Sequence, residues 1–262
     1  MRTNRWFAVL TAGIFALNFG GCQNNSYTDP SSTTGEAGSM SRFAIIEDTL
    51  YAINSAKINA IDISIPTAPL KASRTDAAWG IETLFAYNNY LYVGAFDGMY
   101  IYEQEVSTGD LTLVGHTSHA RSCDPVIVSQ DVAYVTLHAG GGCSVSNTNV
   151  LELYNVSDPS KVTQILSKNM WEPKGLDIDG NQLFVCDGDA GLKVYDINRT
   201  ATEVNATYTD INVTLTRAMN DSTLDCYDLI AHNNILYISN EDSIVQYSYT
   251  GETLTKLSTI SQ

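Results

Sequence analysis

Short extended runs recur along the chain, built from β-branched and aromatic residues that tend to alternate with polar ones. Five of these runs share one phrase, an aromatic residue between two aliphatic residues. The phrases are Leu50-Tyr51-Ala52, Leu91-Tyr92-Val93, Ala133-Tyr134-Val135, Leu183-Phe184-Val185 and Leu236-Tyr237-Ile238. Their aromatic residues stand 41, 42, 50 and 53 positions apart. Repetition on this scale is typical of architectures in which copies of one supersecondary unit pack against each other.

The fourth repeat shows the unit most clearly. It contains four extended runs, Gly175–Ile178, Leu183–Val185, Leu192–Asp196 and a weaker one at Val204–Tyr208. The turns Asp179–Asn181 and Asp187–Gly191 separate the first three runs, and both are built mainly from Asp and Gly, with Asn in the first and Ala in the second. Gly, Asn and Asp tolerate the positive φ that tight hairpins require. Each repeat is therefore predicted to be a meander of four antiparallel strands.

The other repeats follow the same plan, and no sustained helical periodicity occurs after residue 21. Their predicted third strands are Lys57–Ile63, Met99–Glu103, Val150–Asn155 and Ile244–Ser248. Four-stranded units repeated around a ring are the blades of a β-propeller. The predicted fold is an all-β, five-bladed β-propeller over residues 41–262, with blades near 41–79, 80–121, 122–172, 173–212 and 213–262. The alternative is a β-solenoid, but its repeating rungs would be shorter and would lack the paired hairpin turns of this sequence.

Three segments carry a resemblance to a known family. The segments LFVCDGDAGLKVYDI (183–197), CDPVIVSQDVAYVTL (123–137) and LELYNVSDPSKV (151–162) resemble the LVIVD-repeat proteins, exported bacterial propellers of poorly defined function. The first and fifth repeats depart most from the pattern, and Ser248 stands where the repeat usually ends in Asp. The resemblance implies a propeller fold and export. It implies no catalytic residues, because the family has no known common set.

The first 21 residues have the pattern of a signal peptide. Two arginines precede a mostly apolar run of 14 residues, Trp6–Phe19, which is too short to span a membrane. The run leads into Gly20-Gly21-Cys22, which resembles the bacterial lipobox. We expect lipidation at Cys22 and a flexible tether over residues 22–40. The protein would then be a bacterial outer-membrane lipoprotein, with the membrane as a partner that it binds through its lipid anchor. The alternative is an ordinary secretory signal that happens to contain a cysteine.

Charge narrows the range of partners. Loss of the leader removes two arginines and shifts the net charge from −15 to −17. A protein this acidic is poorly suited to binding nucleic acid, so no nucleic acid partner is expected. The remaining partner classes are a protein, a glycan or a small molecule.

Four cysteines remain after Cys22, and we expect all four on one face of the ring. An even number in an exported protein favours disulfide bonds. Of the three possible connectivities we predict Cys123–Cys143, which would pin an inserted loop, and Cys186–Cys226, which would join the fourth blade to the fifth. A cysteine metal site would require a closer spacing such as Cys-x-x-Cys, which is absent.

Other chemical motifs are weak, and neither a cofactor nor a metal is expected. His116 and His119 lack the helix or further ligands of a zinc signature. Asp187-Gly188-Asp189 resembles a fragment of a calcium loop, but Asp-Gly is also what a tight turn needs. No Gly-x-Ser-x-Gly nucleophile motif occurs, and no catalytic residue is predicted with a named role.

Superposing the repeats on their aromatic residue gives the candidate site. The positions 13, 10 and 9 residues before it enter the innermost strand, so they should surround one mouth of the central channel. The predicted ligand-binding residues are Trp79, Glu82, Arg121, Asp124, Trp171, Lys174, Tyr227 and Asp228. Aromatic walls with a few polar groups are typical of ligand pockets. Equally, such side chains can simply fill the channel and pair with one another.

Two function classes follow from these observations. The first is a lipid-anchored, non-enzymatic binding or interaction module of the cell envelope, favoured by the lack of a catalytic motif. The second is a propeller-type glycan hydrolase that uses inward-facing carboxylates, with Glu82, Asp124 and Asp228 as candidates. A retaining glycosidase needs two carboxyl groups about 5 Å apart and an inverting one about 6.5–9.5 Å. Fold alone does not decide between the classes.

Overall fold

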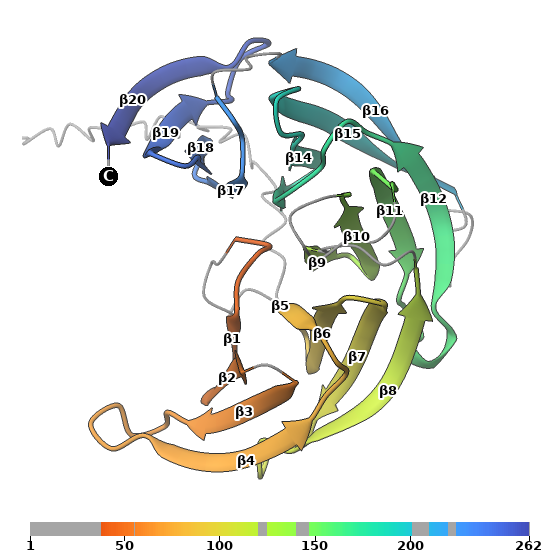
Figure 1. Cartoon of the computed structure of the whole chain (residues 1–262), viewed down its shortest axis with the longest axis vertical. Helices are drawn as coiled ribbons and strands as arrows, with labels where there is room; N and C mark the ends of the chain where they lie inside the picture. The colour runs from red at the N-terminus through yellow and green to blue at the C-terminus, as the bar shows by residue number, and fades with distance from the viewer. Residues whose placement is uncertain are drawn as a thin grey trace, which may run out of the picture.

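The computed structural model describes residues 38–54, 56–119, 125–139, 147–200, 210–219 and 224–261. Within these residues, regular structure consists of twenty β-strands and one 3-10 turn, η1 (Pro159–Lys161). The strands form five sheets of four, and in each sheet consecutive strands pair in antiparallel order. Figure 1 shows the five sheets arranged as blades around a central axis. The predicted five-bladed β-propeller is therefore confirmed.

Each blade is one meander. Blade 1 contains β1 (Phe43–Ile46), β2 (Thr49–Asn54), β3 (Lys57–Asp62) and β4 (Leu70–Asp76), and blade 2 contains β5 (Ile81–Tyr87), β6 (Tyr90–Ala95), β7 (Gly98–Gln104) and β8 (Leu111–Ser118). Blade 3 contains β9 (Val126–Ser129), β10 (Val132–Leu137), β11 (Val150–Asn155) and β12 (Thr163–Asn169), and blade 4 contains β13 (Leu176–Asp179), β14 (Gln182–Cys186), β15 (Leu192–Thr200) and β16 (Asp210–Met219). Blade 5 contains β17 (Asp228–His232), β18 (Ile235–Ser239), β19 (Ser243–Ser248) and β20 (Thr255–Ser261).

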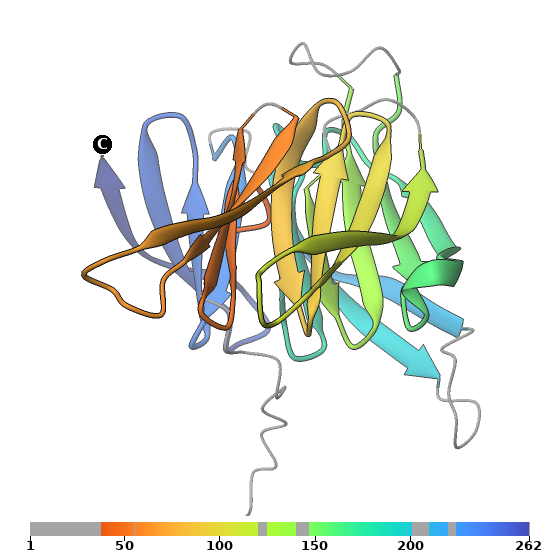
Figure 2. The ribbon, with the colours of Figure 1, turned by 90° about the horizontal axis from the view of Figure 1, so that it is seen from below.

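The first strand of every blade faces the axis and the fourth lies at the rim (Figure 1). Neighbouring innermost strands contact each other in the pairs β1 and β5, β5 and β9, β9 and β13, and β13 and β17. All innermost strands run the same way along the axis, so all begin at the same end of the ring. This end is called the mouth below. Figure 2 shows the blades from the side, with the strands running between the mouth and the opposite end.

A β-bulge interrupts the pairing of third and fourth strands in all five blades. The register shifts fall between Ala60 and Ile61, Ile101 and Tyr102, Leu153 and Tyr154, Val194 and Tyr195, and Gln246 and Tyr247. A bulge bends a strand and increases its twist. Repeated at equivalent positions, it lets each rim strand curve around the ring.

Four hydrophobic cores lie between successive blades, joining blade 1 to 2, 2 to 3, 3 to 4 and 4 to 5. In blades 1 to 4 the repeat aromatic residue points toward the next blade and is fully buried there. These residues are Tyr51, Tyr92, Tyr134 and Phe184. Because every core is shared by two blades, a single blade cannot bury both faces without its neighbours.

The described residues form no such core between blade 5 and blade 1, and Figure 1 shows an interval there. Tyr237, the repeat aromatic of blade 5, is only partly buried. Phe43 in β1 and Ile260 in β20, which lie on the faces turned to the interval, are more than half exposed. Among the described residues, blades 1 and 5 therefore each pack only one face against a neighbouring blade.

Blade 4 differs from the sequence prediction in its outer strand. The run Val204–Tyr208, predicted as that strand, lies outside the described residues. The outer strand is β16, which the prediction had largely assigned to blade 5. It pairs with an unusually long β15 from Leu192↔Met219 to Thr200↔Asp210. The predicted boundary was wrong because alternation identifies a strand but not the sheet that it joins.

Candidate functional site

The described part of the predicted site lies at the mouth of the ring. Trp79 precedes β5, Trp171 precedes β13 and Tyr227 precedes β17, so all three enter an innermost strand from the same end. Arg121 and Asp124 lie outside the described residues, as do Cys22, Cys123 and Cys143. Of the remaining predicted residues, Trp79 and Glu82 form one group between blades 1 and 2, and Lys174 and Tyr227 form a second between blades 4 and 5. Asp228 is buried next to the second group, and Trp171 stands three residues before Lys174.

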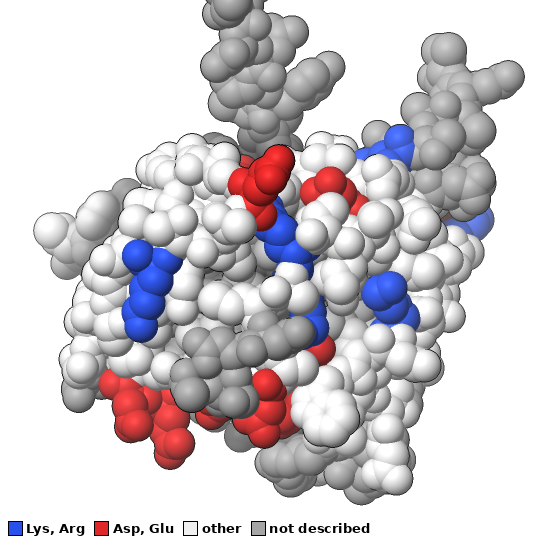
Figure 3. Space-filling model, turned by 90° about the horizontal axis from the view of Figure 1, so that it is seen from above, with Lys and Arg blue, Asp and Glu red and all other residues white. Residues whose placement is uncertain are grey.

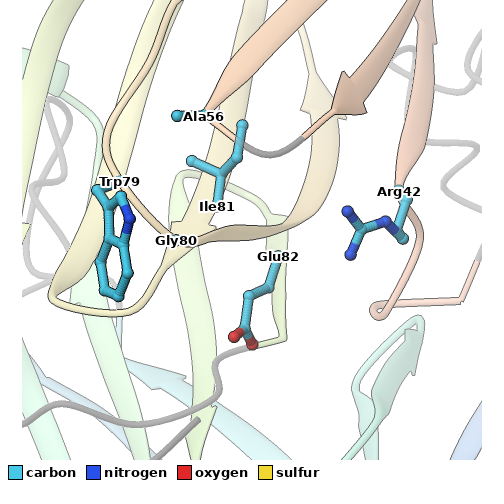
Figure 4. Close-up of a pocket in the computed structure, with 6 residues that line it drawn as sticks. All are labelled: Arg42, Ala56, Trp79, Gly80, Ile81 and Glu82. Carbon is cyan, nitrogen blue, oxygen red and sulfur yellow. The ribbon is translucent and has the colours of Figure 1, made fainter.

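The first group lines a pocket of about 300 Å³. Its wall is made by Arg42, Ala56, Trp79, Gly80, Ile81 and Glu82 (Figure 4). In this view Glu82 lies between the Trp79 indole and Arg42, whose guanidinium group points toward the other two side chains. An aromatic wall with one acid and one base is an arrangement typical of small-ligand pockets.

The Trp79 indole is held against Phe96, yet most of it remains open to solvent. The two ring centroids are 5.4 Å apart and the rings are perpendicular, a favourable aromatic geometry. Even so, Trp79 is 74% exposed. Gly80 makes this arrangement possible, because its φ is +71° and a Cβ there would lie 2.9 Å from the Cβ of Phe96.

Burial changes the acidity of Glu82. Partial removal from water raises the pKa of its carboxyl group, and the positive charge of Arg42 lowers it by a smaller amount. The net effect is a raised pKa. A carboxyl group of this kind exchanges a proton more readily near neutral pH than an exposed glutamate does.

The second group joins blades 4 and 5. The Lys174 ammonium group lies 5.3 Å from the centre of the Tyr227 ring and 3.5 Å from carboxylate oxygens of both Glu172 and Asp225. Gly175 donates a backbone hydrogen bond of 2.9 Å to the carbonyl of Tyr227. Lys174 and Tyr227 were both predicted at the mouth, and the structure brings them together.

A disulfide closes the same region. Cys186 at the end of β14 is bonded to Cys226 just before β17, with a Cα separation of 5.0 Å. This confirms the predicted link between the fourth and fifth blades. The predicted Cys123–Cys143 bond stays a prediction.

Asp228 is buried against a turn that lies between the innermost strands of the ring. The turn is Gly38–Ser41, closed by a 3.0 Å hydrogen bond from the Ser41 amide to the Gly38 carbonyl. The Ser39 hydroxyl donates to Asp228 at 3.4 Å and accepts from the Leu176 amide at 2.9 Å. Burial raises the pKa of Asp228 to about 6. Asp228 therefore holds the turn rather than lining the pocket.

Arg42 is the pocket residue that the sequence prediction missed. It stands nine positions before Tyr51, the repeat aromatic of blade 1. The superposition covered only blades 2 to 5, so this equivalent position was not examined. Extending the same alignment by one blade would have found it.

The described residues show neither a metal-binding cluster nor, on the face drawn in Figure 3, a large basic patch. The described residues contain no group of three or more His, Cys, Asp or Glu that could hold a metal ion. Asp187, from the calcium-like motif, instead accepts hydrogen bonds from the amides of Trp171 and Glu172. On the side shown in Figure 3, lysines and arginines are interspersed with acids among neutral residues, without a large patch of either sign. Among the described helices and turns, none is long and apolar enough to cross a membrane.

Comparison with known proteins supports the fold at low sequence identity. No protein family model matches the chain, and no curated protein sequence matches it. A solved protein from Bacteroides uniformis, provisionally named a 6-phosphogluconolactonase, has a TM-score of 0.64 at 10% identity, covering 84% of this chain and 70% of its own. The periplasmic gluconolactonase of Pseudomonas aeruginosa has a TM-score of 0.61 at 10% identity, with 82% and 67% covered.

A protein from Lactobacillus plantarum has a TM-score of 0.59 at 16% identity, with 83% and 69% covered. Identities this low show the propeller fold alone, because one fold supports many functions.

Proposed function

We propose that this propeller is a hydrolase that acts on a small sugar-derived ester, such as a sugar lactone, in the pocket of Arg42, Trp79 and Glu82. The observation that carries the proposal is the placement of Glu82, a carboxyl group with a raised pKa, between an exposed indole and a guanidinium group. These three groups supply a proton acceptor, a surface for a sugar ring and a positive charge.

Each group has a specific task in ester hydrolysis. The Trp79 indole packs against the C–H face of the sugar ring and orients it. Glu82 takes a proton from water, and the resulting hydroxide oxygen bonds to the carbonyl carbon. The carbonyl electron pair moves onto its oxygen, where Arg42 stabilises the negative charge. When this intermediate collapses, the ester C–O bond breaks and Glu82 returns its proton to the leaving oxygen.

An ester fits this pocket better than a glycoside does. Glycosidases use two carboxyl groups on either side of the scissile bond. In the described part of the pocket Glu82 is the one carboxylate, and the opposite group is a cation. The names of two structural neighbours, a 6-phosphogluconolactonase and a gluconolactonase, agree with this choice of reaction, although the likeness itself concerns the fold.

The test is hydrolysis of glucono-δ-lactone and its 6-phosphate by the purified protein, followed by acid release above the spontaneous rate. Glu82→Gln should reduce the catalysed rate by about 100-fold or more, because general base catalysis typically supplies a factor of about 10²–10⁴. Glu103→Gln, at an exposed position of β7, is the matched control and should leave the rate unchanged. Full activity of Glu82→Gln would rule out this mechanism.

A non-enzymatic binding module is the second candidate, favoured by the high exposure of the Trp79 indole. In that case the pocket should bind the sugar acid or lactone without turnover. Calorimetric binding abolished by Trp79→Ala, together with a hydrolysis rate no higher than the spontaneous one, would select this candidate. Attachment to the cell envelope through Cys22 is compatible with either function and stays a prediction.

A further inference from the structure

Two exposed aromatic side chains enter the innermost strands of blades 4 and 5, away from the pocket. Lys174 connects them, because it contacts the Tyr227 ring and pairs with Glu172, the residue after Trp171. Trp171 is 66% exposed and Tyr227 is 50% exposed. Only four aromatic side chains in the described residues combine large size with high exposure, and three of them, counting Trp79, are at the mouth. Large aromatic residues gathered on one surface often mark a binding site.

The backbone that carries Trp171 is fixed on both sides. Its amide and that of Glu172 donate to the same oxygen of the buried Asp187, at 3.0 and 2.9 Å. The Trp171 carbonyl accepts a hydrogen bond of 2.6 Å from the side chain of Asn149. The indole is therefore presented to solvent from a rigid segment.

Tyr227 is held in a similar way. Its amide donates to the Ser239 carbonyl at 3.0 Å and its carbonyl accepts from the Gly175 amide at 2.9 Å. Its preceding residue, Cys226, is bonded to Cys186 of blade 4. Rigid aromatic groups lose little conformational entropy when a ligand binds, which favours a preorganised contact surface.

The charges around these rings select against anions. The Lys174 side chain is only 12% exposed and is already engaged by Tyr227, Glu172 and Asp225. Glu172 and Asp225 are more exposed than the lysine, so carboxylate oxygens are the charged groups that face solvent. Carboxylates accept hydrogen bonds from hydroxyl groups and repel negatively charged ligands.

From this arrangement we propose that Trp171 and Tyr227 form a surface that binds an uncharged polysaccharide, separate from the pocket between blades 1 and 2. Sugar rings stack their C–H faces on the two aromatic side chains, and their hydroxyl groups donate to Glu172 and Asp225. The surface attaches the protein to a glycan and takes no part in hydrolysis. It does not depend on the function proposed for the pocket.

The experiment is binding of the purified protein to insoluble cellulose and chitin by pull-down, and to a soluble neutral β-glucan by affinity electrophoresis. Polygalacturonate serves as the anionic comparison. Trp171→Ala and Tyr227→Ala should each weaken binding to at least one neutral polysaccharide by about tenfold or more, as expected for aromatic hot spots. Polygalacturonate should bind at least about tenfold more weakly than the neutral polymers.

Two controls separate this surface from other effects. Leu215→Ala removes an exposed apolar side chain from the rim strand β16 and should not change glycan binding. Trp79→Ala alters the pocket and should also leave it unchanged. Near-ultraviolet circular dichroism checks that the Trp171 and Tyr227 variants remain folded, and Tyr227→Phe should retain binding because it keeps the ring.

The expected result is loss of polysaccharide binding in the Trp171 and Tyr227 variants with lactone hydrolysis unchanged. Absence of binding to all three neutral polysaccharides, normal binding by the folded Ala variants, or a preference for polygalacturonate would each overturn the proposal. Failure of lactone hydrolysis in the wild-type protein would concern the pocket alone.

Discussion

Phe184 and Tyr237 occupy the same position in consecutive repeats, but Phe184 is fully buried between blades 4 and 5 whereas Tyr237 is only partly buried. The difference arises because Phe184 packs on the next blade and Tyr237 faces the interval between blades 5 and 1. Phe184→Ala should lower the free energy of unfolding by about 3–5 kcal/mol, the usual cost of truncating a buried aromatic residue. Tyr237→Ala should cost about 1 kcal/mol or less.

Urea denaturation followed by tryptophan fluorescence measures both variants. Tyr134→Ala, in the core between blades 3 and 4, is a second buried example and should resemble Phe184→Ala. Equal losses for Tyr237→Ala and Phe184→Ala would show that the interval is closed in solution by packing on the blade 5 face.

The disulfide between Cys186 and Cys226 should contribute substantially to stability. It spans 40 residues, and cross-linking a loop of this length stabilises a protein by about 4 kcal/mol in the chain-entropy model. Replacing both cysteines by alanine should therefore shift the urea midpoint strongly downward. Adding reductant should lower the midpoint of the wild-type protein and have a smaller effect on the double variant. No change in midpoint for the double variant would show that the bond carries little stability.

Asp228 should make stability depend on pH. Its folded-state pKa is raised from 3.8 to about 6 by burial, so the folded state favours the protonated form. The associated stability is fully present below the unfolded pKa and is lost as the pH rises through about 6. The difference between these limits is on the order of 3 kcal/mol.

Asp228→Asn removes this titration. The stability of the variant relative to the wild type should increase between about pH 4 and pH 7, by up to about 3 kcal/mol, whatever constant offset the amide introduces. Asp242→Asn, in an exposed turn of blade 5, is the control. A pH-independent difference between the wild type and Asp228→Asn would show that this carboxyl group does not titrate in the predicted range.

Hydrophobic alternation was sufficient to predict the blades because each strand must present an apolar face to a neighbouring blade. Four of the five third strands were placed to within one residue, as at Val150–Asn155, whereas the third strand of blade 4 continues to Thr200, four residues beyond its predicted end. The pairing of β16 with β15 was not predictable in this way, since non-local contacts decide which sheet a strand joins. Nor were the five bulges, whose unpaired extra residues lie in the rim strands and carry no backbone signal in the sequence, as Ala72 and Ile165 show.

The site was predictable as far as the repeat alignment reached. Superposition placed Trp79, Glu82, Trp171 and Tyr227 at one end of the ring because equivalent strands begin there. It did not reveal that the site divides into two groups. The turn Gly38–Ser41 lies between the two groups, since it bonds to Leu84 of β5 as well as to Leu176 and Asp228, and these long-range contacts leave no local pattern in the sequence.

Lipidation at Cys22 is a separate prediction that rests on the sequence alone. The mature protein should begin at Cys22 and carry several acyl chains, because a single chain anchors a protein only marginally. Mass spectrometry of the N-terminal peptide after detergent extraction measures this. Cys22→Ser should release the protein into the soluble fraction, and an unmodified N-terminus elsewhere would exclude the lipoprotein assignment.

Gly175 should tolerate no side chain, because it packs directly against Asp228. A Cβ at this position would lie 2.0 Å from the Oδ1 atom of Asp228 and 2.6 Å from its Cα. A flexible side chain could move away, but the Cα belongs to the backbone of β17, so the two innermost strands would have to separate. Gly175→Ala should therefore cost about 1–3 kcal/mol by overpacking. Gly251→Ala is the control, since the nearest atom to its Cβ would be 3.7 Å away. Denaturation of both variants at one pH makes the comparison, and equal stability would mean that blades 4 and 5 are not in contact at this point.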